Sequence, residues 1–338
     1  MEQSKSKNVI PALTLMVLAP LITEVLPGAT RFSSMFVFPI EMCVWGGGAV
    51  LIRYFVRRFQ LGWGSILLLA VALAVAEECV IQQTSFAPMV VRLKGVTYAR
   101  AFGINYVYLV WALIYESVFV VFVPVYLVEL IFPARREGLW INKFGLGLII
   151  VLFFFGSFLA WFSWTRIARP KFYHLPVYHP SPIAFVIAVA VILTLIVLAL
   201  RASSQKSLSS LPGKMPPLWI LFVSGVVWAT LLFGLVLLGF GISPSFPPVF
   251  AVIGGLLLAA AALFFVPRWD AAPGWSDWQT FALIFGTILG SMMVSFLGFI
   301  DQPGIDLYFK IVVDVIAFIL LILLGMKVKK RMLKSRID

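Results

Sequence analysis

The chain has 338 residues, of which 62% are hydrophobic and 12% are charged, and its mean hydropathy is +1.04. A soluble domain has about 45–50% apolar and about 25% charged residues, so the composition excludes an ordinary soluble protein. The net charge of +12 would suit nucleic acid, but the basic residues fall in short segments between apolar runs and near the C-terminus. This distribution is typical of membrane proteins, so we expect membrane lipids as partners and no nucleic acid.

Apolar segments fill most of the chain, and a transmembrane helix needs about 20 such residues. The sequence therefore predicts an all-α polytopic integral membrane protein with about ten transmembrane helices. The first segment has no small-x-small cleavage site after Pro27, so we expect a retained span rather than a signal peptide. The predicted spans are 9–27, 35–56, 62–84, 105–132, 143–166, 182–201, 218–241, 247–267, 278–300 and 307–327.

The distribution of Lys and Arg predicts the orientation. With the N-terminus inside, 18 of the 26 basic residues fall in inner segments and 7 in outer segments, while Lys310 lies within the last span. The positive-inside rule then predicts that both termini are cytoplasmic. The pattern also resembles that of multi-pass bacterial membrane proteins, which implies the bacterial cytoplasmic membrane as the location.

The acidic residues divide what we expect to be a single transmembrane domain, residues 1–338. No Asp or Glu occurs between Glu137 and Asp270. We therefore expect acid-bearing helices in 1–137, acid-free scaffold helices in 138–300, and the last helix with a basic cytoplasmic tail in 301–338.

Five glutamates lie within the apolar segments of the first third of the chain. They are Glu24, Glu41, Glu77, Glu78 and Glu116. The predicted topology puts all five in the outer half of the membrane, where an ionised carboxylate costs at least about 2.5–3.5 kcal/mol. Five acids at one depth predict a shared, acid-lined cavity in the outer leaflet. For Glu24 and Glu41, a position at the membrane interface is the alternative.

The adjacent pair Glu77 and Glu78 is the sharpest local feature. Two close carboxylates cannot both ionise cheaply, so we expect one of them to hold its proton. This suits a proton carrier, a general base or a cation-binding pair; the alternative is an acid that only forms hydrogen bonds between helices. Glu78 and Gln82 are i, i+4 neighbours on one helical face.

A second polar pair occupies the last predicted span. Lys310 and Asp314 are also i, i+4 neighbours. They either form a structural ion pair or bring a cation to the glutamates. Both are therefore candidate site residues.

The run Glu77-Glu78-x-x-x-Gln82 resembles the Glu-Glu-x-x-x-Arg signature of the CPBP (Abi) intramembrane proteases. In that family the glutamate and histidines from other spans build the catalytic site. Here Gln82 stands in place of the arginine, and His174 and His179 fall in a loop rather than in a span. The resemblance therefore implies a relative in which the histidine-dependent chemistry is lost or altered.

Other chemical motifs are weak or missing from the sequence. The two histidines have no Cys or acid nearby, so we expect no metal site. The chain contains no P-loop, no G-x-S-x-G, no H-E-x-x-H and no dinucleotide fingerprint, so no cofactor is indicated.

Three functions stay open on the sequence alone. They are proton- or cation-coupled transport of a small solute, an intramembrane enzyme distantly similar to the CPBP proteases, and a non-catalytic membrane assembly or interaction protein. Transport fits best, because buried acids without a histidine or nucleophile suit the handling of protons or cations better than hydrolysis. The candidate site residues are Glu77, Glu78, Glu116, Glu41, Gln82, Lys310 and Asp314.

Overall fold

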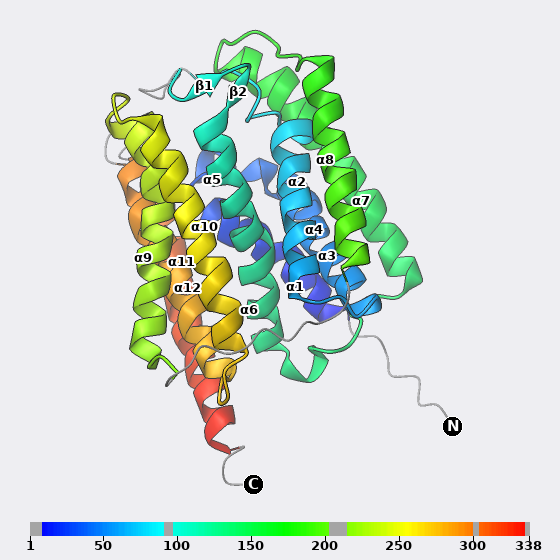
Figure 1. The fold of residues 1–338 in the computed structure, drawn as a ribbon, viewed down its shortest axis with the longest axis vertical. Coiled ribbons are helices and arrows are strands. Elements are labelled where there is room, and N and C mark those ends of the chain that lie inside the picture. The colour runs from blue at the N-terminus through cyan, green and yellow to red at the C-terminus, as the bar shows by residue number, and fades with distance from the viewer. Residues whose placement is uncertain (1–8, 91–96, 203–214, 300–303, 335–338) are drawn as a thin grey trace.

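The computed structural model describes residues 9–90, 97–202, 215–299 and 304–334. Helices make up most of this part of the chain, and its only strands within those ranges are the short antiparallel pair β1 (Arg100–Ala101) and β2 (Ile104–Asn105) (Figure 1). The predicted all-α class is confirmed. The basic loop residues Arg92 and Lys94 lie outside the described residues.

Nine helical stretches of the described chain are long and apolar enough to cross a membrane, and each falls on one of the last nine predicted spans. The first predicted span, 9–27, is instead a shorter apolar helix, Ile10–Val25. At 1.5 Å per residue this helix is about 24 Å long, less than the roughly 30 Å of a hydrocarbon core. The nine stretches are Phe32–Arg58, Trp63–Ile81, Tyr106–Ile131, Lys143–Phe172, Pro182–Arg201, Leu218–Ile242, Pro248–Asp270, Asp277–Phe299 and Ile305–Lys334.

Several stretches combine α-helix with wider π turns or tighter 3-10 turns. In the first half of the chain the α-helices are α1 (Ile10–Pro20), α2 (Phe38–Glu41), α3 (Gly47–Arg58), α4 (Trp63–Val75), α5 (Tyr106–Glu116) and α6 (Val123–Ile131). The π turns there are Leu21–Val25, Met42–Gly46, Ala76–Ile81 and Ser117–Phe122, and the 3-10 turns are Phe32–Val37 and Pro133–Arg135.

The second half of the chain has longer α-helices. They are α7 (Lys143–Phe162), α8 (Pro182–Arg201), α9 (Leu218–Val236), α10 (Pro248–Asp270), α11 (Asp277–Ser295) and α12 (Ile305–Lys334). Its π turns are Ser163–Phe172 and Leu237–Ile242, and Phe296–Phe299 is a 3-10 turn.

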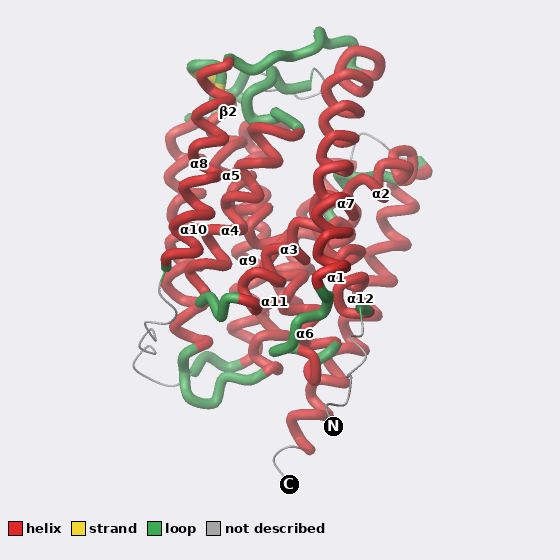
Figure 2. The backbone as a smooth tube through the Cα atoms, turned by 90° about the vertical axis from the view of Figure 1, so that its right-hand side faces the viewer, coloured by secondary structure: helices red, strands yellow, loops and turns green. Residues whose placement is uncertain are grey.

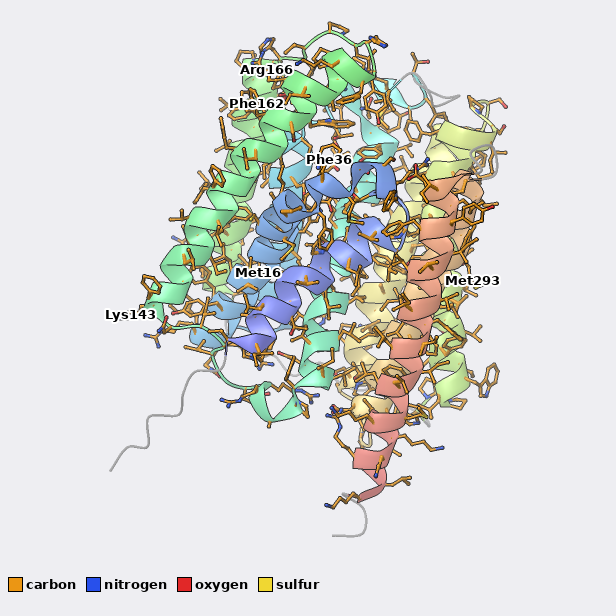
Figure 3. All side chains as sticks on the ribbon, turned by 180° about the vertical axis from the view of Figure 1, so that it is seen from behind. Met16, Phe36, Lys143, Phe162, Arg166 and Met293 are labelled. Atoms are coloured by element: carbon orange, nitrogen blue, oxygen red, sulfur yellow. The ribbon has the colours of Figure 1, made fainter. Side chains whose placement is uncertain are left out.

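The helices run along one common direction, and most loops gather at the two ends of the bundle (Figure 2). We call the end where α3 finishes at Arg58 and α12 finishes at Lys334 the basic end, and the end that carries β1 and β2 the hairpin end. The described chain begins at Val9 and finishes at Lys334 toward the basic end. Seen from behind, α1 crosses obliquely between α7 and α12 (Figure 3).

The α5–α6 stretch stands between two groups of helices. On one side α4 packs along α8, and on the other α9 packs along α11 with α10 and α12 around them. The part 138–300, predicted to be acid-free scaffold, carries Asp270 and Asp277 at the ends of α10 and α11. It is also not uniform, because only 11% of the most apolar segment is buried in α8 and α10, against 61% in the stretch Asp277–Phe299. Helix α11 is therefore a core element, whereas α8 and α10 present apolar surface outward.

Glycines bring α9 and α11 into close contact. A methyl group on Gly286 would overlap the backbone carbonyl of Phe222, and one on Gly290 would meet the carbonyl of Val226. Helices in a membrane gain much of their association energy from such close packing of small residues. Gly46 has the same effect between the α2–α3 stretch and the α1 backbone at Met16.

We predict that Gly286→Ala lowers thermal stability in detergent by the equivalent of about 1–3 kcal/mol, because the added methyl group must push two backbones apart. Gly234→Ala is the matched control on α9, since nothing lies within 4 Å of the position that its Cβ would take. A melting temperature of Gly286→Ala equal to that of the control would show that α9 and α11 do not pack this closely.

Candidate functional site

Each of the four helices that carry a predicted site glutamate has a π turn at that glutamate. In a π turn the backbone N–H bonds to the carbonyl five residues back, which widens the helix; such turns are rare and are frequent at functional sites. Two of them lie inside continuous helices and two end their helices. Glu24 lies in Leu21–Val25, Glu41 directly precedes Met42–Gly46, Glu77 and Glu78 lie in Ala76–Ile81, and Glu116 directly precedes Ser117–Phe122.

Glu116 joins the two acids that follow α4 into one group. Its carboxyl lies close enough to those of Glu77 and Glu78 for their charges to interact. Glu77 is 0% exposed, and neither of its carboxyl oxygens has a hydrogen-bond partner among the described residues. Packed in this way, the three carboxyl groups repel one another when all are ionised, and binding of a proton or a cation relieves that repulsion.

Glu78 has the most hydrogen-bond donors of the three. Ser85 Oγ donates to its Oε2 at 3.0 Å, and the Tyr108 hydroxyl donates to its Oε1 at 3.2 Å. Gln82, the predicted i, i+4 support, is not among the side chains that donate to Glu78 in the described part of the chain. The π turn at Ala76–Ile81 changes the angular spacing of this segment, so spacing for an ordinary α-helix does not apply there.

Glu24 and Glu41 complete the cluster from the α1 and α2 sides. The Thr30 hydroxyl donates to Glu41 Oε1, while Glu41 Oε2 is buried without a partner among the described residues. Glu24 is close enough to Glu41, Glu77 and Glu78 for their charges to interact. It is also half-buried although it lies deep in the bundle, so the cluster is not completely packed over. We refer to these five side chains, Glu24, Glu41, Glu77, Glu78 and Glu116, as the glutamate cluster.

Backbone carbonyls of the π turns tie the helices of the cluster together. Thr23 Oγ1 donates to Phe119 O at 3.0 Å, and the Tyr115 hydroxyl donates to Thr23 O. The first bond joins the turn Leu21–Val25 to the turn Ser117–Phe122, and the second joins it to α5. Widened turns leave carbonyls that the helix itself does not use, and here the neighbouring helix uses them.

Asn105 closes the hairpin end above Glu78. Its amide Nδ2 donates to Thr84 O and Ala87 O, both at 2.8 Å, and its backbone N–H donates to Ser85 O at 2.8 Å. Arg100 Nη1 donates to Asn105 Oδ1 at 2.7 Å. The other bonds of the Arg100 guanidinium go to carbonyls of residues 86 and 87, so Arg100 supports the loop that holds Ser85 rather than pairing with a glutamate.

Lys310 caps the short first helix. It is 1% exposed, and its Nζ donates to Leu26 O at 2.6 Å and to Met292 O at 3.3 Å, pairs with Asp314, and lies 4.4 Å from the centre of the Phe296 ring. A cation at a helix C-terminus satisfies carbonyls that have no partner in the helix. Lys310 and Asp314 therefore fix the helix end that carries Glu24, and the ion pair lies beside the cluster rather than within it.

We predict that Lys310→Met lowers stability by about 3–5 kcal/mol, because it leaves Asp314 buried without its cation. The double variant Lys310→Met/Asp314→Leu should recover part of that loss, since no buried charge then remains unpaired. Thermal unfolding in detergent measures both effects. Lys327→Met is the control, because Lys327 is an exposed lysine on the same helix. If Lys310→Met unfolds at the same temperature as Lys327→Met, the proposed capping role of Lys310 is wrong.

The remaining predicted features lie away from the cluster. His174 and His179 are in the loop that precedes α8. Within the described residues, no group of three or more His, Cys, Asp or Glu has an arrangement that could hold a metal ion.

A sixth glutamate of the interior, which the pattern of outer-leaflet acids did not include, lies at the basic end. Glu129 Oε1 accepts from Arg53 Nε at 3.1 Å and from Arg57 Nη2 at 3.0 Å. Arg53 also donates to Gly138 O and lies over the Trp140 ring at 3.3 Å. In the sequence, Glu129 and its partners Arg53 and Arg57 all lie near the ends of predicted spans.

The hydroxyl donors of the cluster are the functional residues that sequence reasoning missed. They are Thr30, Ser85 and Tyr108. Single hydroxyl residues are common in membrane helices, so nothing in the sequence distinguished these three from the others.

No protein-family model, curated protein or solved structure matches this chain. The resemblance to CPBP proteases therefore rests on Glu77 and Glu78 alone, and any functional assignment rests on the geometry of the site.

Proposed function

We propose that the protein is a membrane transporter that couples the movement of a small solute to protons or monovalent cations bound at the glutamate cluster. One observation carries the proposal: five carboxyl groups from four helices lie close enough for their charges to interact, and none has a cationic partner among the described residues. The ion pairs of this part of the chain are all formed by other acids. Buried carboxyl groups without a fixed cation must bind protons or mobile cations, which suits proton and cation transport.

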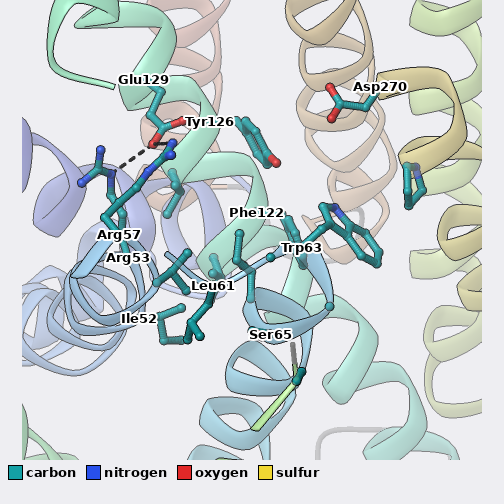
Figure 4. A pocket seen from close by; sticks show the side chains of 18 of the residues that line it. Ile52, Arg53, Arg57, Leu61, Trp63, Ser65, Phe122, Tyr126, Glu129 and Asp270 are labelled. Atoms are coloured by element: carbon teal, nitrogen blue, oxygen red, sulfur yellow. Dashed lines mark hydrogen bonds and ion pairs between the residues drawn. The ribbon is translucent and has the colours of Figure 1, made fainter. Parts of the chain in front are cut away.

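The two ends of the bundle differ in a way that supports this function. At the hairpin end, the Asn105 network covers Ser85 and Glu78. At the basic end, a cavity of about 730 Å³ lies between α3, α4, α6 and α10 (Figure 4). Transport by alternating access needs a central site that is covered on one side while the other side has a cavity.

The test is the charge displaced when the protein, reconstituted in liposomes, meets a sudden change in H⁺, Na⁺ or K⁺ concentration. We expect the wild type to give a transient current with at least one of these ions, because ions enter the cluster. Glu78→Gln and Glu116→Gln keep the size and most hydrogen bonds of the side chain but cannot titrate, so they should fold normally and reduce the current to the level of protein-free liposomes.

Glu137→Gln is the matched control, because the Glu137 side chain is 80% exposed at the basic end. It should keep the wild-type current. A wild-type protein that gives no current with any of the three ions would contradict the proposal, and so would full currents from Glu78→Gln and Glu116→Gln.

A further inference from the structure

Two cavities adjoin at the basic end, and they differ in character. The cavity of about 730 Å³ is lined mostly by apolar residues but also by charged side chains, including Arg53, Arg57 and Glu129. The second, of about 500 Å³, is lined almost entirely by apolar side chains of α9, α10, α11 and the α5–α6 stretch. The two share Trp63, Phe122, Tyr126 and Asp270. Together they form one amphipathic site, polar at the basic end and apolar deeper in the bundle.

The apolar part of this site is rich in aromatic rings. Trp63 and Phe122 pack with their ring centres 5.5 Å apart at the junction of the two cavities. Trp269, next to Asp270, and Trp228 also line the apolar cavity, which extends on α10 from Asp270 to Leu258. This part of α10 corresponds to roughly 18 Å of helix. The space is therefore elongated and has the size of the pockets of about 300–1,000 Å³ that hold drug-sized ligands.

The charges around the site balance except at one residue. Arg53 and Arg57 are bound to Glu129, and Arg57 also pairs with Glu137 at 2.7 Å. Asp270 remains, and within the described part of the chain it has no ion pair or side-chain hydrogen bond.

The basic residue nearest in charge interaction to Asp270, Arg136, already forms an ion pair with another acid. Arg136 is the basic residue that acts on Asp270, and its Nη2 is bound to Asp277 Oδ1 at 2.6 Å. Arg268, two residues before Asp270, donates instead to Phe264 O at 2.9 Å and lies over the Phe264 ring. Asp270 is thus an open carboxylate at the mouth of an aromatic cavity, facing Tyr126 across it (Figure 4).

We propose that this site binds a lipophilic organic cation, with its charge between Asp270 and the aromatic rings and its apolar groups in the deeper cavity. Aromatic faces attract cations, and the attraction grows when the cation is removed from water. The Asp270 carboxylate at the mouth attracts a cation, whereas it would repel an anion and gain nothing from a neutral lipid. This inference rests on the proposed function, for which it names the class of transported solute.

The path between this site and the glutamate cluster runs along one continuous helical stretch. Glu116 ends α5 and Tyr126 lies in α6, roughly 15 Å farther along the axis. The π turn Ser117–Phe122 lies between them, and its last residue lines both cavities. A change in the packing of this turn would act on both sites, which is the physical requirement for coupling the solute to the ions.

Equilibrium dialysis of the purified full-length protein tests the site with two probes of nearly equal shape and opposite charge. Tetraphenylphosphonium is the cation and tetraphenylborate the anion. We expect the cation to bind at least about tenfold more tightly than the anion, which corresponds to about 1.4 kcal/mol. Asp270→Asn should weaken binding of the cation about tenfold and remove the preference over the anion, since one charge is worth at least this much at a partly desolvated site.

Trp63→Leu should weaken binding of the cation about threefold or more, because the aromatic ring face that attracts it is lost. Asp306→Asn is the control, because Asp306 lies at the start of α12, away from both cavities, where it accepts from Ser33. Its affinity for both probes should equal that of the wild type.

Equal binding of the two probes, or unchanged cation affinity in Asp270→Asn, would overturn the inference and identify an unselective apolar groove filled by lipid. The charge displacement of the glutamate cluster is measured without either probe. A normal displacement combined with loss of the cation preference would refute only the solute class. Retained currents in Glu78→Gln and Glu116→Gln combined with Asp270-dependent binding would refute only the coupling function.

Discussion

Seven acids occupy the interior of this bundle, and the cost of a lone carboxylate there limits how each of them can be held. Glu129 lies against Arg53 and Arg57, and Asp314 lies against Lys310. The other five have no such cation within the described chain and instead lie against one another, with hydroxyl donors around them. The two paired acids hold helices together through their ion pairs. The five unpaired acids of the glutamate cluster are the ones that can bind protons or cations.

This constraint explains the irregular backbone around the cluster. A regular α-helix would direct its carbonyls along its own axis, whereas the π turns Leu21–Val25 and Ser117–Phe122 each offer a carbonyl to a neighbouring helix. The first helix ends early, at the level of Leu26, because a buried lysine of α12 satisfies its terminal carbonyl. Irregular backbone is tolerated inside a membrane protein where other protein groups satisfy it in this way.

The sequence predicted the class of fold because long runs of apolar residues are typical of membrane-spanning helices, and nine of the ten predicted spans correspond to long helices. The sequence also predicted the five acids of the glutamate cluster as candidates, because the positions of the apolar segments place them at similar depth. It did not predict the π turns, which depend on packing between helices rather than on any local residue pattern. The short first helix and the bonds to Ser85 and Tyr108 depend on residues distant in the chain, such as Lys310 and Asn105, and periodicity within one helix does not reveal them.

Infrared spectroscopy of the purified protein tests the central claim most directly, because protonated carboxylic acids have a carbonyl stretching band that carboxylates lack. If Glu77, Glu78 and Glu116 share protons, the wild type at neutral pH should show this band, and each of Glu77→Gln, Glu78→Gln and Glu116→Gln should weaken it. Glu137→Gln should leave it unchanged, because that side chain is exposed and paired with Arg57. A wild-type spectrum without the band would mean that all the buried carboxyl groups are ionised, and would contradict a shared, proton-holding cluster.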